Sequence, residues 1–356
     1  MDIVTQKIDK LFKMMVEKKA SDLHLGAGSP PIFRIDGKLI PLETPSLSPE
    51  NLQEMIHSVL TSEQKEKFLK DKELDFSYSL PGISRFRGNV LLQRGTLGAV
   101  FRAVPTRPFT LDELKLPEVI KEFCNKPRGL VLVTGPTGSG KSTTLAAMVD
   151  YINENHSLHI VTIEDPIEFL HRNKKSIIRQ RELGADTNSF ASALKHVLRQ
   201  DPDVILVGEM RDIETISLAV TAAETGHLVL ATLHTLGSPA TIDRIIDVFP
   251  PYQQSQIKTQ LSTMLEAVIS QTLIARADGE GRVCALEIMV GIPAVRNLVR
   301  EGRTEQLLSA IQTGNKHGMQ TLDASLNNLY KQRVITYEDA LFKASNPKEF
   351  KQRAKS

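Results

Sequence analysis

A glycine-rich segment between a short apolar run and a helical pattern, residues 130–144, constrains the fold of this chain more than any other stretch. The apolar run 130–133 leads into the spacing Gly-x-x-x-x-Gly-Lys-Ser over residues 135–142. In a strand–loop–helix setting, the glycines let backbone N–H groups turn inward around a phosphate, and the helix adds its positive end. The segment therefore predicts an α/β fold that binds a nucleoside triphosphate. A glycine-rich turn in an unrelated α/β domain is the alternative, and the complete motif disfavours it.

The residues of this loop divide into phosphate contacts and a metal ligand. Lys141 is expected to place its charge between the terminal phosphates, and the Ser142 hydroxyl is expected to ligate Mg²⁺. The full set of expected nucleotide contacts is Gly135, Pro136, Thr137, Gly138, Ser139, Gly140, Lys141, Ser142 and Thr143.

Composition limits the class of protein. A length of 356 residues suits two domains, and 41% hydrophobic with 24% charged residues is ordinary for a soluble globular protein. A formal charge of +2 argues against a surface that coats nucleic acid. The two cysteines, Cys124 and Cys284, support neither a disulfide framework nor a zinc site. With no apolar run of membrane-spanning length and no signal-peptide pattern, a cytoplasmic location is the default expectation.

The first hundred residues predict a small α+β domain. After an amphipathic opening helix, residues 31–41 predict a hairpin that turns at Asp36-Gly37. One helix is expected over 47–70, and strands are expected over 73–80, 85–94 and 98–104. We expect this domain to end at residue 105 and a linker to cover 106–117.

From residue 118 the pattern becomes strands alternating with helices, which predicts a parallel sheet covered on both faces. The expected strands are 130–134, 159–164, 204–207 and 228–233, and the expected helices are 142–154, 189–199 and 213–225. Beyond Pro251 the chain is expected to be mainly helical apart from 281–290, within a domain that runs from 118 to 356.

Acidic residues follow two of these strands. In phosphate-loop enzymes a strand usually ends in an aspartate that faces the metal, but here Gly208 holds that position and Glu209 follows. Another strand ends in Glu164, Asp165 and, three residues on, Glu168. Holding three carboxylates together is costly without a cation or a proton, so we favour a catalytic cluster over a solvated loop.

Two histidines and four arginines leave alternatives open. His227 and His234 bracket an apolar strand, either as structural residues or as sensors of the γ-phosphate. A shared metal is disfavoured because seven strand residues put them roughly 23 Å apart at about 3.3 Å per residue. The strands of the first domain carry four arginines that either face solvent or reach the phosphates bound by a neighbouring subunit. They are Arg85, Arg87, Arg94 and Arg102.

Four segments together resemble the nucleotide-site motifs of the secretion and pilus ATPases. In chain order, the four segments are similar to the Walker A motif (GPTGSGKST, 135–143), the Asp box (TIEDPIE, 162–168), the atypical Walker B motif (ILVGEMRD, 205–212) and the His box (TGHLVLATLHT, 225–235) of that family. The resemblance covers essentially the whole chain. It implies hexameric rings whose subunits pair a PAS-like N-terminal domain with a RecA-like C-terminal domain around ATP.

The resemblance also implies roles for individual residues. Glu168 corresponds to the glutamate that activates water. Glu164 and Asp165 are expected to support Glu168 and also to lie near the metal. Glu209 corresponds to the Walker B acid. His227 and His234 correspond to the His-box pair, which favours a functional role for both.

A further resemblance concerns direction of force. Residues 294–301, AVRNLVRE, resemble the AIRNLIRE motif associated with pilus retraction, and the chain lacks the four-cysteine motif usual in assembly and type II secretion members. This implies a Mg²⁺-dependent ATPase motor for type IV pilus retraction and twitching motility, coupled through Arg296, Asn297 and Arg300. The implied partners are a homohexamer and an inner-membrane platform protein, with peripheral membrane association only through partners, at the inner face of the cytoplasmic membrane.

Two other functions are alternatives on the same core. A nucleic-acid translocase is disfavoured by the near-neutral charge and by 5% aromatics without tryptophan, which leaves no stacking platform. A nucleotide-binding switch without rapid turnover is disfavoured by the acid-rich site.

Overall fold

The computed structural model describes residues 3–353 of the chain, which divides into two compact units, one ending at Arg107 and one beginning at Pro108. Each unit has its own hydrophobic core. Leu111, which lies in the expected linker, is buried in the core of the second unit. The expected functional domain limits at 105 and 118 stay predictions.

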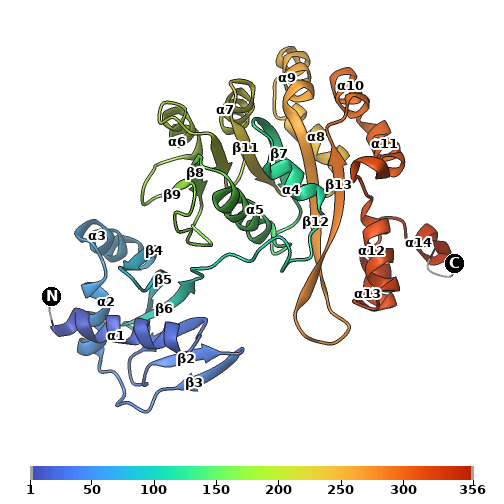
Figure 1. The fold of residues 1–356 in the computed structure, drawn as a ribbon. Helices are drawn as coiled ribbons and strands as arrows, with labels where there is room; N and C mark the ends of the chain where they lie inside the picture. The colour runs from blue at the N-terminus through green and yellow to red at the C-terminus, as the bar shows by residue number, and fades with distance from the viewer. Residues whose placement is uncertain (1–2, 354–356) are drawn as a thin grey trace. The chain divides into compact units, whose positions relative to one another are not determined.

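The first unit is an antiparallel sheet with three helices packed on one face (Figure 1). Its strand order is β3-β2-β1-β6-β5-β4. The strands are β1 (Asp22–Gly26), β2 (Ile32–Ile35), β3 (Lys38–Pro41), β4 (Glu73–Leu80), β5 (Ser84–Gln93) and β6 (Thr96–Val104). The helices are α1 (Ile3–Glu17), α2 (Pro49–Ser58) and α3 (Ser62–Asp71).

Local sequence explains the turns of this unit. The β2–β3 hairpin turns at Asp36 and Gly37, whose φ angles of 48° and 80° are both positive, as a type I′ turn requires. The single helix expected over 47–70 is wrong, because Thr61 begins a new helix with a capping box. The Thr61 hydroxyl accepts from the Gln64 N–H, and the Gln64 side chain accepts from the Thr61 N–H.

The second unit contains a seven-stranded sheet of order β13-β12-β7-β11-β10-β8-β9, in which only β12 and β13 pair antiparallel. The strands are β7 (Gly129–Thr134), β8 (His159–Glu164), β9 (Ile177–Glu182), β10 (Val204–Val207), β11 (Leu228–Leu233), β12 (Leu265–Ala275) and β13 (Arg282–Val290). The helices are α4 (Val119–Cys124), α5 (Lys141–Asn155), α6 (Phe190–Val197), α7 (Ile213–Glu224), α8 (Ser238–Asp247), α9 (Pro251–Met264), α10 (Pro293–Glu301), α11 (Leu307–Thr313), α12 (Leu322–Lys331), α13 (Tyr337–Lys343) and α14 (Pro347–Arg353), with short 3₁₀ turns at Thr304–Gln306 and Asn315–His317.

Helices cover both faces of this sheet, which makes a three-layer arrangement (Figure 1). Helices α4 and α5 pack on one face against alternate residues of β7, such as Val131 and Val133. Helices α6 to α11 pack on the other face against the remaining residues, such as Leu130 and Leu132. Strands buried on both sides read as continuous apolar runs, which is why β7, β10 and β11 are recognisable in sequence.

Two strands of this sheet differ from expectation. Residues 265–275 form β12, an eleven-residue strand beside β7, where a helix was expected. Residues 177–182 form β9, a parallel edge strand that was not expected. Within residues 3–353, no helix is both long and apolar enough to cross a membrane.

Candidate nucleotide-binding site

The phosphate loop joins the end of β7 to the start of α5, as the sequence predicts. Gly135 has a φ of 138°, and a Cβ there would lie 2.3 Å from the Gln271 carbonyl oxygen and 2.7 Å from Ser139 Oγ. Gly140 precedes the first helical residue with a φ of 91°. Only glycine accommodates these angles without strain, so the loop geometry accounts for both residues.

Gln271 of β12 holds the loop from the neighbouring strand. Its side chain is 2% exposed, and its Nε2 donates a hydrogen bond to the Ser139 carbonyl at 2.7 Å. The register pairs Ser270 with Thr134, so the next residue of β12 reaches the loop directly. Sequence reasoning missed Gln271 because β12 was expected to be helical.

Lys141 folds back over the loop. Its Nζ donates to the carbonyl oxygens of Gly135 at 2.8 Å and Pro136 at 3.1 Å, and the residue is 9% exposed. Burial lowers the pKa of Lys141, and the charge of Glu209 acts in the opposite direction. Both carbonyl acceptors belong to the phosphate loop, so the ammonium lies against that loop.

The loop carries donors that suit phosphate oxygens. Thr134 Oγ1 and Ser139 Oγ are buried and have no hydrogen-bond partner among the described residues. Ser142, in the first turn of α5, has an exposed side chain. The part of the chain that is described holds no group of three or more His, Cys, Asp or Glu that would bind a metal by itself.

Glu209, directly after β10, belongs to an ionic cluster near the loop. Arg211 Nη2 donates to Glu209 Oε2 at 2.6 Å, and His234 Nε2 lies 3.0 Å from Glu209 Oε1. Burial alone would raise the pKa of Glu209, but the bonds from Arg211 and His234 outweigh it and lower that pKa. The structure thus brings together Glu209, His234 and the loop lysine. Arg211 was not singled out from sequence, although it lies two residues from Glu209.

Glu164, the last residue of β8, is engaged by its own surroundings. Thr162 Oγ1 donates to Glu164 Oε1 at 2.6 Å, and Gln180 Nε2 donates to the same oxygen at 3.0 Å. Burial raises the pKa of Glu164 despite these bonds. These contacts give Glu164 a structural role in the loop that follows, and its contact with a metal stays a prediction.

The other two acids of this segment lie in the loop after β8. Asp165 is exposed and precedes a cis peptide bond to Pro166, and Glu168 is half-buried. Strand β8 is three strands from β7, roughly 14 Å at about 4.8 Å per strand. Roles for Asp165 at the metal and for Glu168 in catalysis therefore stay predictions.

His227 does not join the site within this chain. It immediately precedes β11, whose first residue pairs with Gly129 at the start of β7. The phosphate loop is at the other end of these parallel strands, roughly 20 Å away over six residues. His227 Nδ1 lies 2.8 Å from the Ala222 carbonyl oxygen, so its observed contact closes the turn after α7.

Helix α10 carries the three residues expected to couple hydrolysis to movement. Arg296 is fully engaged: it donates to the Gly291 carbonyl at 2.6 Å, the Thr263 carbonyl at 2.6 Å and Glu266 Oε1 at 2.5 Å. Arg300 donates to Asn297 Oδ1 at 2.5 Å, on a more exposed part of the helix. Arg296 therefore fastens α10 to the junction of α9 and β12, and a coupling role for the three residues stays a prediction.

Two of the four arginines expected to act across subunits, Arg85 and Arg102, have local partners in the first unit. Arg102 Nε forms an ion pair with Asp22 Oδ1 at 2.8 Å, and Arg85 Nη1 donates to Ser79 Oγ at 3.3 Å. Arg87 is paired directly opposite Arg102 in the sheet, and Arg94 lies in the exposed turn between β5 and β6. Their action on another subunit stays a prediction.

A parallel sheet with this loop at the end of one strand, and an acid after a strand two positions away, defines a nucleotide-binding protein of the P-loop class. The family profile described as "Type II/IV secretion system protein" matches residues 1–338. The chain belongs to this family.

Individual relatives match over nearly the whole chain. The "Type IV pilus retractation ATPase PilT" of Pseudomonas aeruginosa is 51% identical over 343 residues, covering 96% of this chain and 99% of the relative. A "Twitching motility protein" of Neisseria gonorrhoeae is 52% identical over 316 residues, covering 89% of this chain and 84% of the relative. The crystal structure of the pilus retraction motor PilT with bound ADP superposes with a TM-score of 0.89 at 47% identity, covering 99% of both chains.

Proposed function

We propose that this chain is a Mg²⁺-dependent ATPase motor that powers type IV pilus retraction and twitching motility. The observation that carries the proposal is the arrangement of Lys141, Glu209 and His234 at one edge of the sheet. Relatives named for pilus retraction and twitching motility match most of the chain, which supports the cellular role. The bound ADP of the similar structure supports the choice of nucleotide.

The chemistry is in-line attack of water on the γ-phosphate, catalysed by positioning and charge. Lys141 exchanges the two loop carbonyls for phosphate oxygens and neutralises their charge. Glu168 accepts the proton of the attacking water, while His234, oriented by Glu209, faces the γ-phosphate. Mg²⁺, when bound through Ser142, supplies further charge for the terminal phosphates.

The assembly follows from the same family. We propose a homohexameric ring of subunits with a PAS-like first domain and a RecA-like second domain. An inner-membrane platform protein receives the force at the inner face of the cytoplasmic membrane, and no nucleic acid takes part. Glu164 and Asp165 support the site from outside the direct contacts described above, and a functional role for His227 would have to lie outside the site of its own chain.

Two variants test the proposal in the assembled protein. Glu168→Gln is expected to abolish steady-state ATP hydrolysis while leaving ATP binding intact, and Lys141→Ala is expected to lose both. Cells carrying either variant are expected to extend pili and fail to retract them. Intact hydrolysis by Glu168→Gln would contradict the assignment of the base.

A further inference from the structure

The loop that carries Glu168 is anchored by side chains of β9 on both sides of that residue. Glu182 Oε2 accepts a hydrogen bond from the Ile167 N–H at 3.0 Å, one residue before Glu168. Gln180 Nε2 donates to the Phe169 carbonyl at 2.8 Å, one residue after it. The backbone at Glu168 is therefore fixed between two adjacent contacts to one strand.

Gln180 makes two further contacts, one with His171 and one with Glu164. Its Oε1 accepts from the His171 N–H at 2.8 Å, so both ends of the side-chain amide are used on the loop. Its Nε2 also donates to Glu164 Oε1, and the Glu164 carboxylate accepts a hydrogen bond from the backbone N–H of Glu168 itself. Gln180 thus reaches Glu168 directly along the loop and indirectly through Glu164.

The position of β9 explains why these polar side chains serve the loop. It is an edge strand of the sheet, in register with β8 so that Gln180 pairs with Thr162 and Glu182 pairs with Glu164. Glu182 is only 4% exposed, and a buried carboxylate is costly unless it is hydrogen-bonded. The Ile167 N–H in the loop backbone supplies a hydrogen bond to the Glu182 carboxylate.

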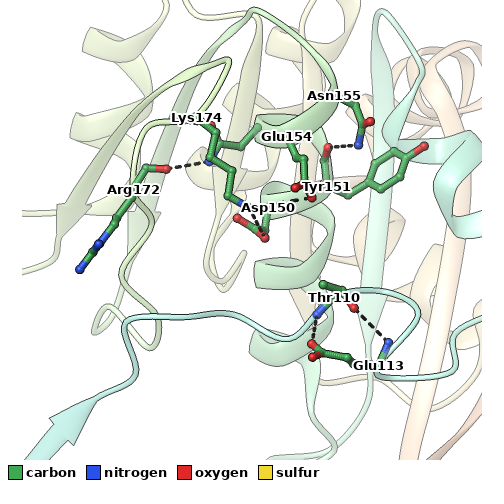
Figure 2. Close-up of polar contacts among 9 residues, drawn as sticks. Thr110, Glu113, Asp150, Tyr151, Glu154, Asn155, Arg172 and Lys174 are labelled. Carbon is green, nitrogen blue, oxygen red and sulfur yellow. Dashed lines mark hydrogen bonds and ion pairs between the residues drawn. The ribbon is translucent and has the colours of Figure 1, made fainter. Parts of the chain in front are cut away.

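The far end of the same loop is fastened to the helix that begins at Lys141. Lys174 Nζ forms an ion pair with Asp150 Oδ2 at 2.9 Å (Figure 2). The Arg172 carbonyl accepts from Asn153 Nδ2 at 2.8 Å. The loop is therefore bonded to β9 on one side and to α5 on the other.

We propose that Gln180 is a positioning residue for ATP hydrolysis: it fixes the backbone that follows Glu168 and holds Glu164, which accepts from the Glu168 N–H, so that the Glu168 carboxylate meets the attacking water. This inference rests on the proposed function, in which Glu168 is the base. Displacing a catalytic group by about 1 Å costs on the order of 100-fold in rate, so contacts that define its backbone matter to turnover.

A double-mutant cycle tests whether Gln180 acts through Glu168. Gln180→Ala is expected to lower kcat on the order of 100-fold with KM for ATP unchanged, because the phosphate loop is not touched. In a Glu168→Gln background, the same change is expected to cause no further loss of residual single-turnover hydrolysis. Unchanged kcat in the single variant, or a full additional loss in the double variant, would overturn the inference.

Gln180→Glu gives a readout that a purely structural role would not move. The carboxylate keeps the acceptor for the His171 N–H but loses both donated bonds and places a second charge beside Glu164. Protonation restores a donor, so kcat of this variant relative to wild type is expected to recover as pH falls. A constant ratio across pH would contradict the proposal, and this variant keeps the test available if Gln180→Ala unfolds.

Arg179→Ala is the matched control, since Arg179 is the preceding residue of β9 and its side chain is exposed. Its kcat is expected to equal that of wild type, and thermal unfolding of each variant verifies the fold. If wild type fails to hydrolyse ATP, or Glu168→Gln hydrolyses it normally, the proposed function fails. If both behave as expected and the Gln180 variants match wild type, only the present inference fails.

Discussion

Gly135 and Gly138 lie three residues apart in the phosphate loop, in very different surroundings. A Cβ on Gly135 would collide with the Gln271 carbonyl oxygen, whereas a Cβ on Gly138 would meet nothing within 4 Å. Both residues have positive φ angles, so alanine is strained at either position. The steric clash is the difference between the two.

Gly135→Ala is therefore expected to destabilise the nucleotide-free protein by roughly 2 kcal/mol more than Gly138→Ala, since it adds overpacking to the shared backbone strain. Denaturant unfolding of both variants without nucleotide measures the difference in free energy of unfolding. Equal losses would contradict the close approach of β12 to the loop.

Glu164 provides a pH-dependent prediction. Its folded-state pKa is raised, so the folded protein binds this proton more tightly than the unfolded chain does. The cost of ionising Glu164 in the folded protein grows as pH rises above the unfolded value of 4.5 and disappears as pH falls below that value. Glu164→Gln keeps an oxygen for Thr162 and Gln180 to bond. Its thermal midpoint is expected to equal or exceed that of wild type at pH 7, with the advantage shrinking toward pH 4. An advantage that grows as pH falls would reverse the sign and contradict the raised pKa.

At the scale of elements, apolar strands were predictable and polar ones were not. Strands β7, β10 and β11 are continuous apolar runs, and their ends place Lys141, Glu209 and His234 in the site. Strand β9 has the mostly polar sequence Ile-Ile-Arg-Gln-Arg-Glu. Its polar side chains bond the loop that carries Glu168, and the sequence does not show where that loop lies. Strand β12 follows α9 with no intervening residue, so no glycine or proline marks the change of structure. Gln271 and Gln180 were therefore out of reach of sequence reasoning.

Helix α10 shows how a residue assigned to coupling also holds the fold. Arg296 contacts two carbonyls and Glu266, so Arg296→Ala is expected to destabilise the protein by about 2 kcal/mol as those acceptors lose a charged donor. Arg300→Ala removes only a bond to Asn297 and is expected to change stability by less than about 0.5 kcal/mol. Thermal unfolding of both variants measures these effects.

Arg300→Ala is consequently the cleaner test of coupling. If the exposed part of α10 transmits movement, this variant loses retraction in cells and keeps wild-type ATP hydrolysis. Normal retraction with normal stability would remove Arg300 from the coupling surface.

At the scale of the whole molecule, the two units have separate cores, one built around Phe12, Phe86 and Phe101 and the other around the parallel sheet. The chain between them includes exposed Thr106 and Arg107. Limited chymotrypsin digestion is expected to cleave first after Phe109, whose side chain is exposed, and to leave two protease-resistant fragments, which mass spectrometry identifies. First cleavage inside either core would show that the units do not fold separately.

The contacts of Lys141 bear on how such a site lets its product go. The Lys141 ammonium donates to the carbonyl oxygens of Gly135 and Pro136 within its own loop. When a nucleotide binds, its phosphate oxygens therefore replace these two carbonyl oxygens around the Lys141 ammonium. When ADP leaves, the same carbonyl oxygens are available to take its place. The loop carbonyls therefore compete with phosphate oxygens for the lysine.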